Sequence, residues 1–280
     1  MIGLFKHKTP ATIVLLLIFG LLIKLPLFLF PRPLQFTVDD GILYKYLFQS
    51  FTTGNPFFCS ITAFLLLYMQ ALVATFITNE NRLMTKQTFL PGMSYLLITS
   101  FLPEWNYLSA ALVATTLMMW SCSRLFKLYN VPYAGGSIYN IGLIIGISSM
   151  IFFPSVFLAV CILLGLLILR SFRFNELLLF LLGIITPYYF YAVSLFLTDQ
   201  LILQDLVPAI GIQLPQPISS LWLIAGIILL GVPFIAGGFY IQTQLGKMLI
   251  QARKNWAIFL FYLLFALIIS FFSNYSSFQN

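Results

Sequence analysis

The sequence predicts an all-α fold: a polytopic bundle of about nine transmembrane helices that forms a single integral membrane domain over residues 1–280. Two observations lead to this prediction. Hydrophobic residues make up 61% of the chain and charged residues 8%, whereas a soluble domain carries about 45–50% and about 25%. The apolar residues also form continuous runs rich in Leu, Ile and Phe, and not the alternating segments of about ten residues that are typical of barrel strands.

Each long apolar run predicts one span, because a hydrocarbon core of about 30 Å needs about 20 residues of helix. The predicted spans cover residues 12–30, 57–78, 89–103, 107–126, 138–153, 155–169, 177–198, 219–243 and 256–272. The three shortest runs, 89–103, 138–153 and 155–169, have ends that the sequence leaves open, because Pro91, Pro103 and Pro154 mark ends or kinks there. The first run continues without a small-residue cleavage site, so we expect an uncleaved helix and not a secretory signal.

The basic residues predict a cytoplasmic N-terminus. With that orientation the inner loops hold eleven basic residues and the outer loops two, Arg32 and Lys45, while Lys24 lies within the first span. The inner residues are Lys6, Lys8, Arg82, Lys86, Arg124, Lys127, Arg170, Arg173, Lys247, Arg253 and Lys254. The net charge of +7 then lies mainly beside anionic lipid head groups. We therefore expect a multi-pass protein of the bacterial cytoplasmic (inner) membrane, with membrane lipids and not nucleic acid as its partners.

Several function classes are excluded by what the sequence lacks. Cys59, Cys122 and Cys161 fall at or inside spans without a C-x-x-C pairing, so we expect them to be small buried hydrophobic residues. His7 is the single histidine, which excludes polyhistidine iron, copper or zinc centres and disfavours a Ser-His-Asp hydrolase. No phosphate-binding loop or dinucleotide fingerprint occurs. On this interpretation no cofactor is required.

The same topology places five acidic residues on the outer side: Asp39, Asp40, Glu104, Asp199 and Asp205. The first two begin the run DDGILYKYLFQSF, which predicts a short amphipathic helix on the outer membrane surface, with Ile42, Leu43, Tyr46, Leu47 and Phe51 on its apolar face. Thr37 and Asp40 match a capping-box variant, so the two aspartates can simply begin this helix. Alternatively they bind a divalent cation or act as a general base toward a sugar hydroxyl. The identity of any metal stays unknown.

Lys24 is a candidate site residue because a lysine within a span costs about 2.5–3.5 kcal/mol unless it finds a partner or reaches the interface. Pro26 opens the helix backbone nearby. Two interpretations are open. The side chain snorkels upward along the helix, or its ammonium holds a lipid phosphate or pairs with Asp39 or Asp40.

In the seventh span, Tyr188 and Tyr191 lie on one helical face above a proline. They form either an aromatic packing stripe or a groove for an isoprenoid chain or a sugar ring. Gly142 and Gly146 form a G-x-x-x-G motif that predicts a helix contact within the fold. At the inner side, Arg173 and Glu176 have helical spacing, which predicts a solvated ion pair.

The segments Lys24-Leu25-Pro26, Pro31-Arg32-Pro33 and Asp39-Asp40-Gly41 together resemble the opening of GT-C type glycosyltransferases, membrane enzymes that use polyprenyl-phosphate sugars. The resemblance covers about the first 130 residues and continues through 91–105, which is similar to that family's third span and second outer turn. It implies that Asp39 is a base or metal-linked catalyst and Asp40 its neighbour. The chain as a whole resembles a family of small polytopic inner-membrane proteins from Bacteroidota, which implies no particular chemistry.

Two functional hypotheses follow. In the first, the chain is a reduced GT-C-like glycosyltransferase or polyprenyl-phosphate-sugar binder at the outer membrane face. Asp39 and Asp40 are then catalytic, and the substrate-binding residues are Lys24, Glu104, Tyr188 and Tyr191. In the second, it is a non-catalytic scaffold or subunit of a cell-envelope complex that presents its outer loops to a membrane-protein partner. A transporter is less favoured, because it would need charged groups at a midplane cavity and the spans contain only Lys24.

Overall fold

The computed structural model describes residue 5 and residues 10–34, 36–37, 40–52, 55–84, 86–101, 103–170, 173–199, 221–244, 246 and 248–272. Within these ranges, the side chains of residues 10, 50–52, 103–104, 221–230, 244 and 267–272 lie outside the description.

The described chain is all-α, as predicted, with one isolated β-bridge between Asp40 and Phe152. Its α-helices are α1 (Pro10–Ile23), α2 (Leu25–Leu29), α3 (Ile42–Thr52), α4 (Pro56–Glu80), α5 (Leu90–Ile98), α6 (Ala110–Phe126), α7 (Gly135–Ile151), α8 (Val156–Leu169), α9 (Phe174–Leu197), α10 (Leu221–Gln244) and α11 (Ile250–Phe272). Short 3-10 helices follow α5 and α7, namely η2 (Pro103–Asn106) and η3 (Phe153–Ser155). A helix overlaps every predicted span, and α3 is the predicted helix of the first loop.

Two of the described helices, α4 and α9, are long and apolar enough to cross a membrane by length and composition. Local signals account for many of the helix ends. Asn55 begins α4 by accepting a hydrogen bond from the backbone N–H of Phe57 at 3.2 Å, and Ser109 does the same for Leu112 at the start of α6 (3.3 Å). Pro154 lies in η3, which separates α7 from α8 at the boundary between two predicted spans.

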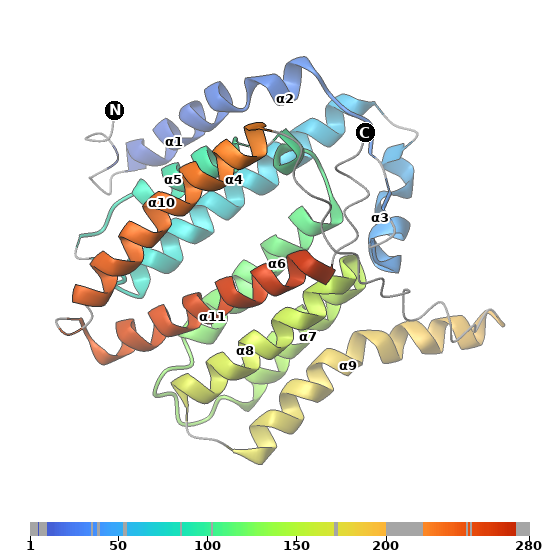
Figure 1. Cartoon of the computed structure of the whole chain (residues 1–280). Coiled ribbons are helices and arrows are strands. Elements are labelled where there is room, and N and C mark those ends of the chain that lie inside the picture. The colour runs from blue at the N-terminus through green and yellow to red at the C-terminus, as the bar shows by residue number, and fades with distance from the viewer. Residues whose placement is uncertain are drawn as a thin grey trace.

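The axes of most helices lie roughly parallel to one another, and α3 lies across one end of the bundle (Figure 1). The central hydrophobic core joins α6, α7, α8, α9 and α11 and contains Met118, Leu125, Ile141, Ile162 and Phe180 among other buried residues. A second core joins α4 and α6 to the first loop and α3. A third packs α1 against α4 and α5.

Helices α7 and α9 approach so closely that their backbones touch. A Cβ atom on Gly142 would lie 2.3 Å from the carbonyl oxygen of Phe180, and one on Gly146 would lie 2.5 Å from that of Ile184. The predicted G-x-x-x-G contact is therefore confirmed as a contact within the fold. Gly183 on α9 completes it, because its Cβ would lie 2.4 Å from the carbonyl oxygen of Tyr139.

The loops predicted to share one side of the membrane meet at one end of the bundle, which we call the basic end. The backbone N–H of Phe89 donates to Phe5 (2.9 Å), Lys127 forms an ion pair with Glu80 (3.3 Å), and Asn255 donates to Asn81 (3.2 Å). The other end, which we call the Lys24 end, joins α2, the first loop, α3, η2 and the 152–155 turn. From α4 to α9, successive helices thus alternate between the two ends, as a bundle of antiparallel neighbours requires.

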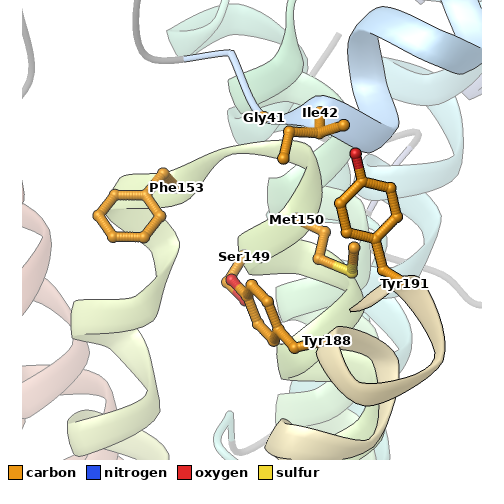
Figure 2. A pocket seen from close by; sticks show the side chains of 7 residues that line it. All are labelled: Gly41, Ile42, Ser149, Met150, Phe153, Tyr188 and Tyr191. Carbon is orange, nitrogen blue, oxygen red and sulfur yellow. The ribbon is translucent and has the colours of Figure 1, made fainter. Parts of the chain in front are cut away.

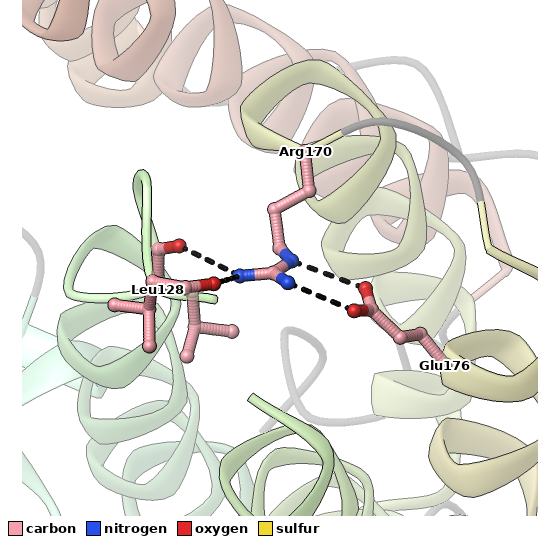
Figure 3. Close-up of polar contacts among 4 residues, drawn as sticks. Leu128, Arg170 and Glu176 are labelled. Atoms are coloured by element: carbon pink, nitrogen blue, oxygen red, sulfur yellow. Dashed lines mark hydrogen bonds and ion pairs between the residues drawn. The ribbon is translucent and has the colours of Figure 1, made fainter. Parts of the chain in front are cut away.

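The predicted ion pair between Arg173 and Glu176 is wrong, because Glu176 pairs with Arg170. The guanidinium donates to both carboxylate oxygens at 2.8 and 3.1 Å, and also to the backbone carbonyls of Leu128 (3.2 Å) and Val131 (Figure 3). Arg173 precedes α9 in an extended conformation (φ −135°, ψ 119°), so helical spacing does not apply to it. The side chains of Arg170 and Glu176 are only 9% and 16% exposed, so this pair is not the solvated one that we expected.

Candidate functional site

Lys24 lies at a break in the first predicted span, between α1 and α2, where Pro26 lies in the first turn of the second helix. The residue is 2% exposed, so the snorkelling interpretation is wrong. Its Nζ donates to Thr99 Oγ1 at 3.0 Å and to Asn106 Oδ1. These acceptors come from the end of α5 and from η2, so the ammonium joins three segments of the chain.

Both acceptors of the Lys24 ammonium are neutral. Among the described residues it forms no ion pair with Asp40, while Asp39, the other predicted partner, lies outside the described residues. An ammonium has three N–H donors, and these two hydrogen bonds use two of them. A buried cation with only neutral partners is costly, which makes Lys24, Thr99 and Asn106 a candidate site for an anionic group. We call these three residues the Lys24 cluster.

Asp40 is buried and holds the first loop in shape. One of its carboxylate oxygens, Oδ2, accepts a hydrogen bond from the backbone N–H of Thr37 (2.6 Å), and its own N–H donates to the carbonyl of Thr37 (3.3 Å). The predicted Thr37–Asp40 contact therefore forms. It closes a turn just before the helix instead of capping it, because α3 begins at Ile42.

Gly41 fastens this turn to the end of α7. Its N–H donates to the carbonyl of Ile151 at 2.8 Å, and a Cβ atom here would lie 2.0 Å from the carbonyl oxygen of Met150. The residue after the two aspartates must therefore be glycine, because nothing larger fits between the two backbones. The glycine in the Asp-Asp-Gly segment is the sequence signal for this close approach. The spacing of residues does not reveal that the neighbouring backbone is the end of α7.

Part of the predicted apolar face of α3 lies on the protein surface, which is where a helix that rests on a membrane presents that face. Tyr46 and Leu47 are 76% and 51% exposed, whereas Tyr44 is fully buried with its ring centroid 4.8 Å from that of Phe48. The helix packs on α4 and α7, so Tyr44 and Phe48, one turn apart, define its inner face. Burial, followed by the nearby charge of Asp40, raises the pKa of the Tyr44 phenol above its ordinary value.

Tyr188 and Tyr191 line one small hollow together with the first loop (Figure 2). Tyr191 points toward Ile42 at the start of α3, and the Tyr188 hydroxyl shares a hydrogen bond of 2.8 Å with Ser149 Oγ of α7. The free volume of this hollow, about 10 Å³, is enough for about one water molecule. A sugar ring needs an opening between α3 and α9 before it fits here.

Not every predicted site residue is described. Asp39 and Asp205 lie outside the described residues, and the side chain of Glu104 does too, although its backbone belongs to η2, which also carries Asn106. Asp199 follows the end of α9 with a positive φ of 52° and is exposed. The described residues contain no group of three His, Cys, Asp or Glu side chains that could hold a metal ion.

Sequence patterns did not indicate Thr99, Asn106, Tyr44 or Ser149. Thr and Ser are common in helices as packing residues, so their type alone carries no signal for a site. Comparisons with protein-family models, curated proteins and solved structures found no match.

Proposed function

We propose that the chain is a multi-pass protein of the bacterial cytoplasmic membrane that binds a polyprenyl-phosphate sugar at the Lys24 end, which faces outward. Support comes from the apolar helices, from the two ends between which they alternate, and from the basic residues gathered at one end. The positive-inside rule assigns that basic end to the cytoplasm. The acidic first loop then lies outside, where lipid-linked sugars are used as donors.

The single observation that carries this proposal is the buried ammonium of Lys24 with its two neutral acceptors. A lipid phosphate provides the missing negative charge, and its oxygens accept the third N–H of the ammonium. The break between α1 and α2 brings Lys24 to this position near the end of the first span. A polyprenyl chain would then extend along the apolar outer faces of the neighbouring helices.

The resemblance to GT-C enzymes supplies the chemistry of the proposal. Asp39 acts as the base that accepts a proton from the acceptor hydroxyl, or as ligand of a divalent cation. Asp40 keeps the loop in shape through Thr37, so the proposal assigns the chemistry to Asp39. Tyr188 and Tyr191 face the same loop, and Glu104 shares η2 with a member of the Lys24 cluster.

The test is to replace Lys24 with methionine, which has a similar length and no charge. Hydrogen bonds to charged groups contribute about 1.5–3 kcal/mol, so bound polyprenyl phosphate should fall about tenfold or more. Mass spectrometry of lipids that copurify with the full-length protein measures this loss. Lys45→Met, on the exposed side of α3, is the matched control and should retain the lipid. Equal lipid content in both variants and the unchanged protein would refute the proposal.

Substituting both Asp39 and Asp40 with Asn separates binding from chemistry. We expect this variant to keep the lipid and to lose sugar transfer or the glycolipid phenotype, with expression unchanged. An unaltered phenotype would remove the enzymatic part of the proposal.

The second candidate is a non-catalytic scaffold or subunit of a cell-envelope complex. It is favoured by the structural use of Asp40 and Gly41, which join the first loop to α7. In this case the exposed face of α3 contacts a membrane-protein partner. Purification of a stable hetero-complex without bound polyprenyl lipid would favour this candidate.

A further inference from the structure

A second cavity, of about 410 Å³, lies at the basic end, away from the Lys24 cluster. Helices α4, α6 and α7 and the segment after α6 form its walls. Val73 and Phe76 give it an apolar side, whereas Ser123 and Ser137 contribute hydroxyl groups. A volume of this size is typical of cavities that hold small molecules or lipid head groups.

Two cations border this cavity. The Arg124 guanidinium lies 5.0 Å from the centre of the Trp120 ring, and the Lys127 ammonium lies 5.0 Å from that of Phe76. Lys127 also forms an ion pair with Glu80 at 3.3 Å, whereas Arg124 forms no ion pair with any described carboxylate. The cavity therefore has a net positive charge.

The arrangement matches the chemistry of a phospholipid at the membrane surface. A guanidinium binds phosphate oxygens through two parallel hydrogen bonds, and serine hydroxyls donate further ones. Trp120 is half exposed beside Arg124, and tryptophan is enriched at the level of the lipid head groups. The apolar side, toward Val73 and Phe76, is suited to the beginning of an acyl chain.

We propose that this cavity binds the head-group phosphate of an anionic phospholipid of the inner leaflet, through Arg124 and Lys127. The site depends on the membrane embedding and orientation of the proposed function, but not on polyprenyl-lipid binding or sugar transfer. It would hold the α6–α7 connection against the membrane surface.

The test uses the full-length protein in mixed micelles that contain equal amounts of phosphatidylglycerol and phosphatidylcholine, with native mass spectrometry of bound lipid. The unchanged protein should retain phosphatidylglycerol preferentially. Substituting Arg124→Gln together with Lys127→Gln should weaken the binding of phosphatidylglycerol about 5- to 30-fold. Each basic residue near anionic lipid contributes up to about 1 kcal/mol, and the ion pair with Glu80 reduces the contribution of Lys127. Ser137→Trp should also weaken it by filling the cavity from an exposed position without changing the charge.

The matched control is Lys86→Gln together with Arg253→Gln, which removes two exposed cations of the same predicted side outside the cavity. It should retain the phosphatidylglycerol preference. An equal loss in this control, or no preference in the unchanged protein, would overturn the proposal. Displacement of the lipid by millimolar inorganic phosphate would also overturn it, since the cavity would then be a site for the free anion. Lys24→Met should leave this binding unchanged, so the two proposals fail separately.

Discussion

Replacing Gly41 with alanine should detach the first loop from α7. The added Cβ would lie 2.0 Å from the carbonyl oxygen and 2.5 Å from the carbonyl carbon of Met150, and these backbone atoms cannot move as a side chain can. Overpacking of this kind costs about 1–3 kcal/mol, and loss of the hydrogen bond to Ile151 adds about 0.5–1.5 kcal/mol. We therefore expect the free energy of unfolding to fall by about 1.5–4.5 kcal/mol. If undocking the first loop from α7 costs less than this, the fall equals the cost of undocking.

The control is Gly136→Ala, the same change in a helix. A Cβ atom on Gly136 meets nothing within 4 Å, so alanine should stabilise α7 by about 0.5–1 kcal/mol. Denaturant titration in detergent measures both changes. Cys59 provides a local reporter, because it is buried in the same core as Tyr44 of α3. Gly41→Ala should therefore increase the rate at which a maleimide labels Cys59. Mass spectrometry identifies the labelled cysteine. Changes of the same sign in both variants, or unchanged protection of Cys59, would refute the reasoning.

Two further predictions concern buried polar groups. Glu176→Gln should lower the free energy of unfolding by about 1–3 kcal/mol, because it leaves the mostly buried Arg170 without its charged partner. Arg173→Gln should change the free energy of unfolding by less than about 0.5 kcal/mol. If denaturant titration finds equal changes for the two variants, the pairing of Glu176 with Arg170 is contradicted. Tyr44→Phe should be neutral or stabilising, because no partner is found for the buried hydroxyl among the described residues, whereas Tyr44→Ala should cost about 3–5 kcal/mol. The raised pKa of Tyr44 means that the folded state holds this proton more tightly, so its contribution to stability is present below pH 10, the ordinary pKa, and is lost above it. Thermal unfolding measured between pH 8 and about 11 should therefore show a smaller alkaline loss in Tyr44→Phe than in the unchanged protein.

The helices could be predicted from the sequence because their signals are local. Continuous apolar runs mark each helix, and residues such as Asn55 and Pro154 mark ends within a few positions of themselves. The G-x-x-x-G motif predicted a close contact for the same reason, since a surface of small residues can be read along a single helix. The Thr37–Asp40 contact spans only three residues and was predicted as well.

The partners of individual side chains depend on residues that lie far apart in the chain. Lys24 contacts Thr99 and Asn106, which are 75 and 82 positions away, and no periodicity connects positions at that separation. Glu176 pairs with Arg170 and not with the predicted Arg173, because Arg173 precedes α9 in an extended conformation. Composition and residue spacing predict which segments form apolar helices. The packing of these helices against one another decides which polar side chains contact each other in the interior.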